Sequence, residues 1–292
     1  MSLPRRTWKG RVSRSAGTAA WCLLAAGLLG TCSRSNDRYA EDLLAAYEEA
    51  WDGPLSPLAG IEGQTLEAEG TVRVSIFMYH SVAPWYPGMS RVQRDLTVEP
   101  AVFDGQMRYL KENGFTAVSL EDLIDHLLRG APLPDKPVVL TFDDGWENQY
   151  RYGLPALAKY GHRATFFVTT DFLGHGRFMT WPQIKELEAQ GMSIGSHTKS
   201  HPFLARVSEP RVKGEVEGSK AVLEKFLGHP VRTFAYPYGS YNSRVASAVH
   251  AAGYDAARGV ASGRRHSAAG RYGLRCLAAV NSLKTFQDQL AK

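Results

Sequence analysis

The nine residues PVVLTFDDG, at positions 137–145, decide the fold. The first six are apolar or β-branched throughout, which is typical of a parallel strand buried on both faces. The run then passes directly into Asp143, Asp144 and Gly145. The segment therefore predicts a buried parallel strand that ends in two carboxylates.

Outward from this strand, short apolar runs alternate with helical patterns from Val72 onward, which is typical of βα units. The expected strands are 72–80, 115–119, 137–142, 163–170, 192–197, 232–237, 254–259 and 272–280. Helices are expected after Pro100, after a capping box of Ser119 and Asp122, and after Thr180. Further helices are expected near residues 208–227 and 242–252.

This order predicts an α/β fold in one domain, a (β/α) barrel of seven to eight strands that is deformed or incomplete. The reason is that the strand at residues 254–259 is weak and no helical pattern follows it. A doubly wound open sheet is the alternative. Its nucleotide-binding form is not supported, because no glycine-rich phosphate loop follows the first strand.

Composition excludes several classes of protein. The chain has 292 residues, of which 44% are hydrophobic and 22% charged, so disorder, collagen and coiled coil are excluded. The formal net charge is +5, and five basic residues lie in the first 32 residues, which contain no acid. The remainder is therefore neutral, and no nucleic-acid partner is expected.

The N-terminus resembles an export signal. Residues 15–31 are uncharged and rich in Ala, Gly and Leu. The sequence LLGTC at 28–32 is similar to a bacterial lipoprotein cleavage box, which makes Cys32 the lipidated residue. A twin-arginine signal and an uncleaved anchor are the alternatives. We expect an exported protein of the bacterial cell envelope, either a membrane-attached lipoprotein or periplasmic.

The chain accordingly divides into a signal peptide (1–32), a lead-in helix and linker (33–70) and a folded α/β domain (71–292). The lead-in contains one amphipathic helical pattern near residues 37–51, and we expect little chemistry there. Cys276 has no partner in the mature chain, so we expect no disulfide and a buried strand position for it.

Polar residues of uncommon type stand where the strands end, which is where βα loops of a barrel converge. These residues are His80, Asp143, Asp144, His197, His201, Tyr236, Pro237 and Tyr238, with Arg275 inside the last strand. His197 and His201 lie four residues apart, and with one aspartate they supply three ligands, as in a catalytic zinc site with an open position. Capping or surface histidines, and ordinary turn chemistry for the aspartates, are the alternatives.

Three motifs in this order and spacing resemble the polysaccharide deacetylase family, the carbohydrate esterases with a NodB homology domain. They are TFDDG (141–145), HTKSH (197–201) and FAYPYG (234–239), and the resemblance covers about residues 72–292. It implies that Asp144, His197 and His201 bind one divalent metal ion, Zn²⁺ first and Co²⁺ or Ni²⁺ as alternatives. It also implies that Asp143 is the catalytic base.

The same resemblance gives the third motif its role. Tyr236, Pro237 and Tyr238 would line the substrate groove, and the backbone N–H of Tyr238 would stabilise the oxyanion. Trp85, Tyr86 and Trp181 are candidates for an aromatic platform for sugar rings or, equally, for small satellite cores.

Two departures from the family pattern affect the expected site. Ala235 stands where many members have an arginine, and the C-terminal Leu-x-His that supplies a general acid is absent. The early MYHSV (78–82) is similar to the poly-N-acetylglucosamine deacetylase branch, which makes His80 the general acid; a packed strand-end histidine is the alternative. Arg275 would pair with Asp143 in place of the missing arginine, unless it lies at the surface.

The expected function is removal of N-acetyl groups from an N-acetylglucosamine-containing polysaccharide of the cell envelope or matrix, by metal-activated water. An O-acetyl esterase acting on a xylan-like glycan and a non-catalytic carbohydrate-binding protein are the alternatives. The expected partners are the polysaccharide and, through lipidated Cys32, the membrane.

Overall fold

The computed structural model describes residues 38, 40–49 and 70–291. The expected signal peptide and Cys32 lie outside these residues. Within the described part, residues 40–49 are helical, as expected for the lead-in. No helix in that part is long and apolar enough to cross a membrane.

Seven parallel strands of the described chain close into a barrel. The ring runs β2–β12–β10–β9–β8–β7–β6 and is closed by pairing of β6 with β2. The barrel strands are β2 (Ser75–Tyr79), β6 (Pro137–Phe142), β7 (Thr165–Val168), β8 (Ser193–Ser196), β9 (Thr233–Ala235), β10 (Ala256–Ser262) and β12 (Leu274–Ala278). The predicted single-domain (β/α) barrel is confirmed, and the open sheet is excluded.

One of the eight expected strands, the one at residues 115–119, lies outside the ring. β5 (Thr116–Val118) pairs with residues 137–139 of β6, while residues 141 and 142 of β6 pair with β7. One edge of β6 is thus shared between two neighbours, so β5 cannot enter the barrel. Two small pairs complete the sheets: β1 (Val72–Arg73) with β11 (Arg265–His266), and β3 (Ser81–Val82) with β4 (Thr97–Val98).

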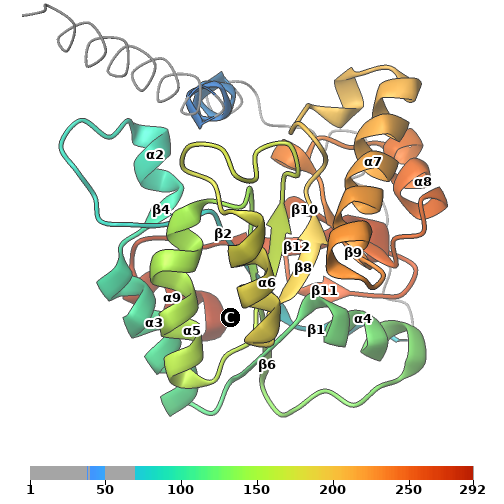
Figure 1. Cartoon of the computed structure of the whole chain (residues 1–292). Helices are drawn as coiled ribbons and strands as arrows, with labels where there is room; N and C mark the ends of the chain where they lie inside the picture. The colour runs from blue at the N-terminus through green and yellow to red at the C-terminus, as the bar shows by residue number, and fades with distance from the viewer. Residues whose placement is uncertain (1–37, 39, 50–69, 292) are drawn as a thin grey trace, which may run out of the picture.

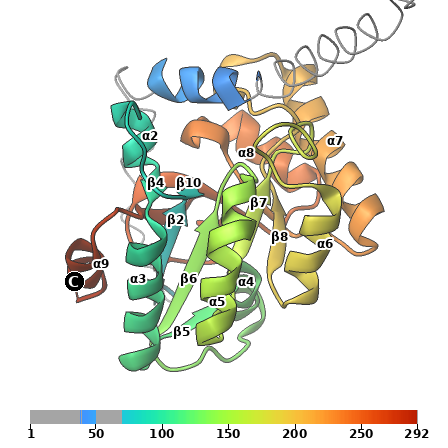
Figure 2. The same cartoon turned by 60° about the vertical axis from the view of Figure 1, so that its left-hand side comes forward.

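Helices surround the barrel (Figures 1 and 2). They are α2 (Arg91–Asp95), α3 (Pro100–Glu112), α4 (Leu120–Arg129), α5 (Leu154–Tyr160), α6 (Trp181–Ala189), α7 (Glu209–Leu227), α8 (Ser243–Ala251) and α9 (Leu283–Ala291). α3 has Pro100 at its first turn, and α4 begins with the expected capping box of Ser119 and Asp122. Between β10 and β12 there is only the short η4 turn (Arg271–Gly273) and β11, as the sequence predicted.

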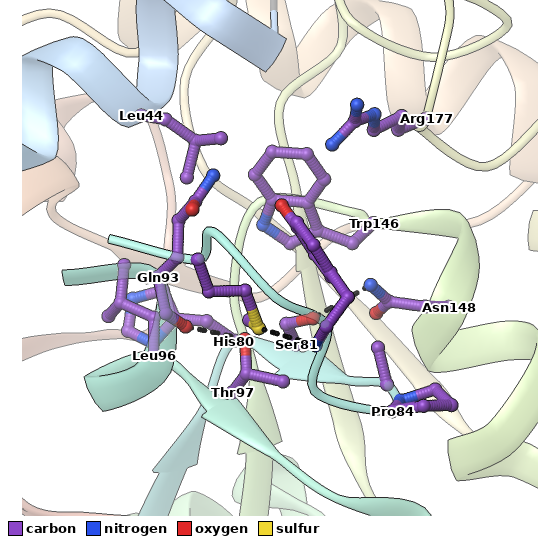
Figure 3. Close-up of a pocket in the computed structure, with 13 residues that line it drawn as sticks. Leu44, His80, Ser81, Pro84, Gln93, Leu96, Thr97, Trp146, Asn148 and Arg177 are labelled. Carbon is purple, nitrogen blue, oxygen red and sulfur yellow. Dashed lines mark hydrogen bonds between the residues drawn. The ribbon is translucent and has the colours of Figure 1, made fainter. Parts of the chain in front are cut away.

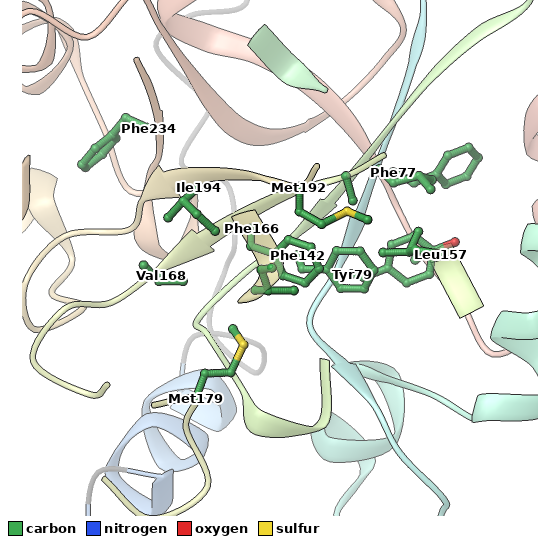
Figure 4. Close-up of a cluster of buried hydrophobic side chains, with 14 of the residues drawn as sticks. Phe77, Tyr79, Phe142, Leu157, Phe166, Val168, Met179, Met192, Ile194 and Phe234 are labelled. Atoms are coloured by element: carbon green, nitrogen blue, oxygen red, sulfur yellow. The ribbon is translucent and has the colours of Figure 1, made fainter. Parts of the chain in front are cut away.

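The core has two layers because side chains alternate along each strand. Phe77, Tyr79, Leu140 and Phe142 belong to the layer under the helices, where Phe142 stacks between Tyr79 and Phe166 at ring distances of 5.1 and 4.7 Å (Figure 4). Ile76 and Val139 belong to a second cluster that includes three side chains of α4. α4 therefore covers the amino end of the barrel, and the carboxyl end is left for the polar residues.

Candidate active site

The carboxyl ends of the strands bring the predicted polar residues together. His80 follows β2, Asp143 and Asp144 follow β6, and His197 follows β8. All are buried, with exposed fractions of 7% for His80, 3% for Asp143, and 0%, 1% and 4% for Asp144, His197 and His201. A cluster of ionisable side chains with so little water around it is a candidate functional site.

Three side chains direct their ligand atoms toward a common point, those of Asp144, His197 and His201. The Oδ1 atom of Asp144 lies 3.5 Å from His197 Nε2 and 3.3 Å from His201 Nε2, and the two Nε2 atoms are 3.1 Å apart. Ligands about 2.1 Å from a tetrahedral ion are roughly 3.4 Å apart, so the donor set fits a divalent metal. Asp144 and His201 have φ angles of 76° and 59°, which turns both toward this spot. These three residues could hold a metal ion.

Hydrogen bonds fix the chemical state of this triad. His197 Nδ1 lies 2.8 Å from the Ala235 carbonyl, which can only accept, so Nδ1 carries the proton and Nε2 offers its lone pair. Burial lowers the pKa of His201 to about 4, so its ring is neutral at neutral pH. Burial raises the pKa of Asp144, but the adjacent His197 and His201 outweigh it and hold this pKa well below its usual value. Neutral imidazoles and an ionised carboxylate are the forms that bind metal.

The neighbouring carboxylate has different surroundings. Asp143 Oδ2 is paired with the Arg258 guanidinium, and His80 Nε2 lies 4.0 Å from the same oxygen. Among the described residues, Asp143 Oδ1 has no hydrogen-bond partner although it is buried. One oxygen is therefore held and the other is left to accept a proton.

The expected pairing of Arg275 with Asp143 is wrong. Arg275 occupies an outward position of β12, where it is exposed and donates to the Ser262 carbonyl at 3.1 Å. The cation is Arg258, which is fully buried on β10. Arg258 is the register partner of Ala235, so the neighbouring strand supplies the guanidinium missing from the third motif.

Sequence reasoning also missed Gln149, in a π-helical turn (Gln149–Gly153) after β6. Its buried Nε2 donates to the carbonyls of His80 and Asp143 at 2.6 and 2.5 Å. This side chain ties together the two loops that carry the candidate base and acid. Burial lowers the pKa of His80, so its ring is neutral at neutral pH.

The two tyrosines of the third motif, FAYPYG, have different positions: one faces the site and the other packs behind it. Tyr238 has a φ of 56° and lies in the short η3 turn (Pro237–Gly239), with its ring 4.5 Å from that of His201. Tyr236 instead stacks on Tyr241 and donates to the Tyr272 carbonyl at 3.0 Å. Tyr238 therefore faces the triad, whereas Tyr236 supports the loop from behind.

The lead-in helix reaches the site, contrary to the expectation of little chemistry there. The Tyr47 hydroxyl donates to Asp144, 3.1 Å from Oδ1 and 3.3 Å from Oδ2. The Trp146 indole N–H donates to Oδ2 of the same carboxylate at 2.8 Å. The only sequence signal for Tyr47 was its place on the amphipathic helix, which does not identify what the helix packs against.

A pocket of about 180 Å³ opens beside the site, with His80 and Trp146 in its wall (Figure 3). Leu44 of the lead-in helix and Tyr86, which is 50% exposed, also line it. Of the other candidate platform residues, Trp85 is 42% exposed, and Trp181 packs on Phe226 with ring centroids 4.6 Å apart. Trp181 is therefore part of a core.

The fold and site together define a parallel (β/α) barrel with a candidate metal site at the carboxyl ends of its strands. Residues 130–257 match the model of the polysaccharide deacetylase family. The chain is 29% identical to Streptococcus pyogenes deacetylase PplD, solved with acetate, with a TM-score of 0.70 over 75% of this chain and 98% of that one. The chain thus resembles polysaccharide deacetylases, by the family match at residues 130–257 and by its likeness to nearly all of PplD.

The chain is also similar to three further proteins. The structure of IcaB from Ammonifex degensii is 25% identical, with a TM-score of 0.65 over 75% of this chain and 96% of that one. The poly-β-1,6-N-acetyl-D-glucosamine N-deacetylase of Escherichia coli K12 is 30% identical over 122 residues, 36% of this chain and 18% of the relative. YxkH of Bacillus subtilis is 29% identical over 65% of this chain, and the alignment spans 65% of that protein.

Proposed function

We propose that this protein is a metal-dependent deacetylase that removes N-acetyl groups from an N-acetylglucosamine-containing polysaccharide of the cell envelope or matrix. The observation that carries the proposal is the difference between two adjacent carboxylates. Asp144 faces two imidazole nitrogens, whereas Asp143 has one oxygen held by Arg258 and the other unpartnered within the described chain. Metal binding alone has no use for the second carboxylate.

In this proposal, Asp144, His197 and His201 hold one divalent ion, Zn²⁺ by preference and Co²⁺ or Ni²⁺ as alternatives. When bound, such an ion lowers the pKa of a water molecule toward about 7 and polarises the acetyl carbonyl. Asp143 takes the proton of the attacking water on its free oxygen, while Arg258 keeps the carboxylate in place. The Tyr238 backbone N–H donates to the developing oxyanion.

His80 is the proposed general acid. Because its ring is neutral at neutral pH, it must first receive a proton, and Asp143 Oδ2 lies 4.0 Å from its Nε2. The proton that Asp143 takes from the attacking water balances the proton that His80 delivers to the leaving amine. Gln149 keeps the two backbones at this separation.

We also propose that residues 1–32 direct export and that Cys32 is the lipidated residue, with 71–292 as the catalytic domain. The sequence of the first 32 residues supports this proposal. It would place the enzyme at the membrane of the bacterial cell envelope or in the periplasm, next to an extracellular glycan.

The test is acetate release by the purified full chain from β-1,4- and β-1,6-linked N-acetylglucosamine oligomers and from acetylated xylan, with and without a chelator. The expected result is release from an amide substrate that stops on chelation and returns with Zn²⁺. Release from xylan alone would establish an O-acetyl esterase instead. Metal binding with no release from any substrate would identify a carbohydrate-binding protein.

A further inference from the structure

The helix of residues 40–49 lies across the carboxyl end of the barrel (Figure 2). Its inner face consists of Ala40, Leu43 and Tyr47, which are 1%, 3% and 5% exposed. These side chains pack in one cluster with four aromatic residues, Trp146, Phe172, Phe178 and Tyr238. We name these four residues the aromatic collar.

Tyr47 is the centre of this contact. Its ring lies 5.0 Å from Tyr238, 5.4 Å from His80 and 5.6 Å from His201, and its hydroxyl bonds Asp144. The helix therefore contacts the candidate ligands, the candidate acid and the collar at once. A polysaccharide segment could not reach Asp144 while Tyr47 occupies this position.

The attachment of the helix is narrow. Its outer face is polar, with Glu41, Asp42, Glu48 and Glu49 exposed. Leu44 and Ala46 are half-buried against the same cluster, and Leu44 also lines the pocket beside His80. Docking thus depends on the apolar side chains of one short helix and one hydroxyl, a small contact for an element that must stay fixed.

Movement of the helix away from the barrel would expose the aromatic collar. Aromatic faces are the surfaces on which sugar rings stack, and three of these four residues, Tyr238, Phe172 and Trp146, contact His201 or Asp144. At present the four are 2–8% exposed. Their chemistry suits a glycan. In this structure Trp146 stacks on Phe178 and Tyr238 stacks on Phe203, and the inner face of the helix packs against the same cluster.

We propose that residues 40–49 form a lid that occupies the glycan-binding collar in the resting protein and leaves it when polysaccharide binds. The inference rests on the proposed function, because it takes the collar to be the glycan site. Tyr47 closes the site through its bond to Asp144, and Leu43 anchors the lid. The lead-in segment thus regulates access to the site.

The test compares two substitutions on the same helix in the full chain. Leu43→Glu puts a charge into the buried face, and Ala45→Glu puts the same charge on the exposed face. Both proteins are loaded with Co²⁺, and the rate of metal loss to excess pyridine-2,6-dicarboxylate is followed by absorbance. We expect at least tenfold faster loss from Leu43→Glu and wild-type loss from Ala45→Glu. Tyr47→Phe, which keeps the ring, should lie between.

Equal rates of metal loss in Leu43→Glu and wild type, with circular dichroism showing both folded, would overturn the lid. Hydrogen exchange at residues 40–49 is a second measurement. Saturating N-acetylglucosamine oligomer should raise it at least tenfold in wild type, and unchanged protection with oligomer bound would overturn the proposal as well.

Acetate assays on the same proteins separate this proposal from the proposed function. If Leu43→Glu loses metal faster but no protein releases acetate, the lid proposal stands and the deacetylase proposal is rejected. Acetate release with equal rates of metal loss would leave the deacetylase and reject the lid.

Discussion

Two arginines at opposite ends of the barrel pair with aspartates in different surroundings. Arg232, just before β9, bonds Asp255 at 2.7 Å and Asp125 at 2.5 and 3.1 Å, and these side chains are 26–32% exposed. Arg258, on β10, bonds Asp143, and these side chains are 0% and 4% exposed. The side chains of the Arg232 pairs remain partly exposed to solvent, whereas those of the Arg258–Asp143 pair are buried.

The difference shows what each pair can do. A buried ion pair loses its hydration, and the Coulomb attraction of its charges often only offsets that loss. The Arg258–Asp143 pair is therefore poorly explained by stability, and better explained by the need to hold a reactive carboxylate in one orientation. The Arg232 pairs join β9, α4 and the start of β10, which is a structural role.

The largest expected effect on acetate release comes from replacing His80, which lies beside the buried Arg258–Asp143 pair. His80→Gln keeps a polar side chain of similar reach but cannot relay a proton. Acetate release should fall by about 100- to 10,000-fold, the usual contribution of a general acid. Metal content, measured by mass spectrometry, should stay at the wild-type value. Undiminished turnover would leave His80 as a packed strand-end residue.

The next effect is on the Arg258 pair itself. Arg258→Met leaves the Asp143 carboxylate buried without its cation, which should lower the free energy of unfolding by about 3–5 kcal/mol. Acetate release should fall as well, since the base loses its orientation. Urea unfolding measures the first and the acetate assay the second.

Arg275→Met is the matched control, because Arg275 is exposed and bonds only a carbonyl in the described structure. It should change stability by less than about 0.5 kcal/mol. A loss equal to that of Arg258→Met would show that the wrong arginine has been assigned.

The third effect follows from His266 on β11, far from the metal-site residues along the barrel. Burial lowers its pKa to about 4, while the unfolded chain titrates near 6.5. The unfolded state therefore binds the proton first, and the stability contributed by the neutral ring is lost as pH falls from 6.5 toward 4. The loss should reach roughly 3 kcal/mol at pH 4.

His266→Gln keeps a donor for the Val74 carbonyl, which His266 Nε2 contacts at 3.0 Å, but does not titrate. Unfolding of chelated wild type and variant between pH 7 and pH 4 should give a flatter profile for the variant. Parallel profiles would mean that the pKa of His266 is the same in the folded and the unfolded chain.

The smallest effect is expected at the solvated pair. Arg232→Met should cost about 1 kcal/mol of unfolding free energy, because partly exposed ion pairs contribute little each. Acetate release should stay within about twofold of wild type. If Arg232→Met proved as costly as Arg258→Met, burial would not be what separates the two pairs.

The sequence predicted the barrel because buried strands and capped helices each have a local signature, as at Pro137–Phe142 and Ser119. It also predicted which polar residues share the carboxyl end, since strand ends meet there in any parallel barrel. It could not place β5 outside the ring, because that depends on which strands share the edge of β6. Local pattern alone does not set this pairing.

Arg258 and Tyr47 show the same limit in the site. Arg258 reaches Asp143 only because β10 pairs with β9 in the register that sets it beside Ala235. An arginine in an apolar strand suggests a buried cation, but strand alternation turns Arg275 outward. Tyr47 is 97 residues from Asp144, and helical periodicity gives only its face.

The most direct test measures metal content and acetate release on the same preparations of wild type and Asp143→Asn. The account predicts one metal ion per chain in both proteins, because Asp144 and the two histidines are unchanged. It predicts at least about 100-fold slower acetate release from Asp143→Asn, since the amide cannot take the proton. Wild-type release from Asp143→Asn, or loss of the metal with this substitution, would contradict the separate roles of the two carboxylates.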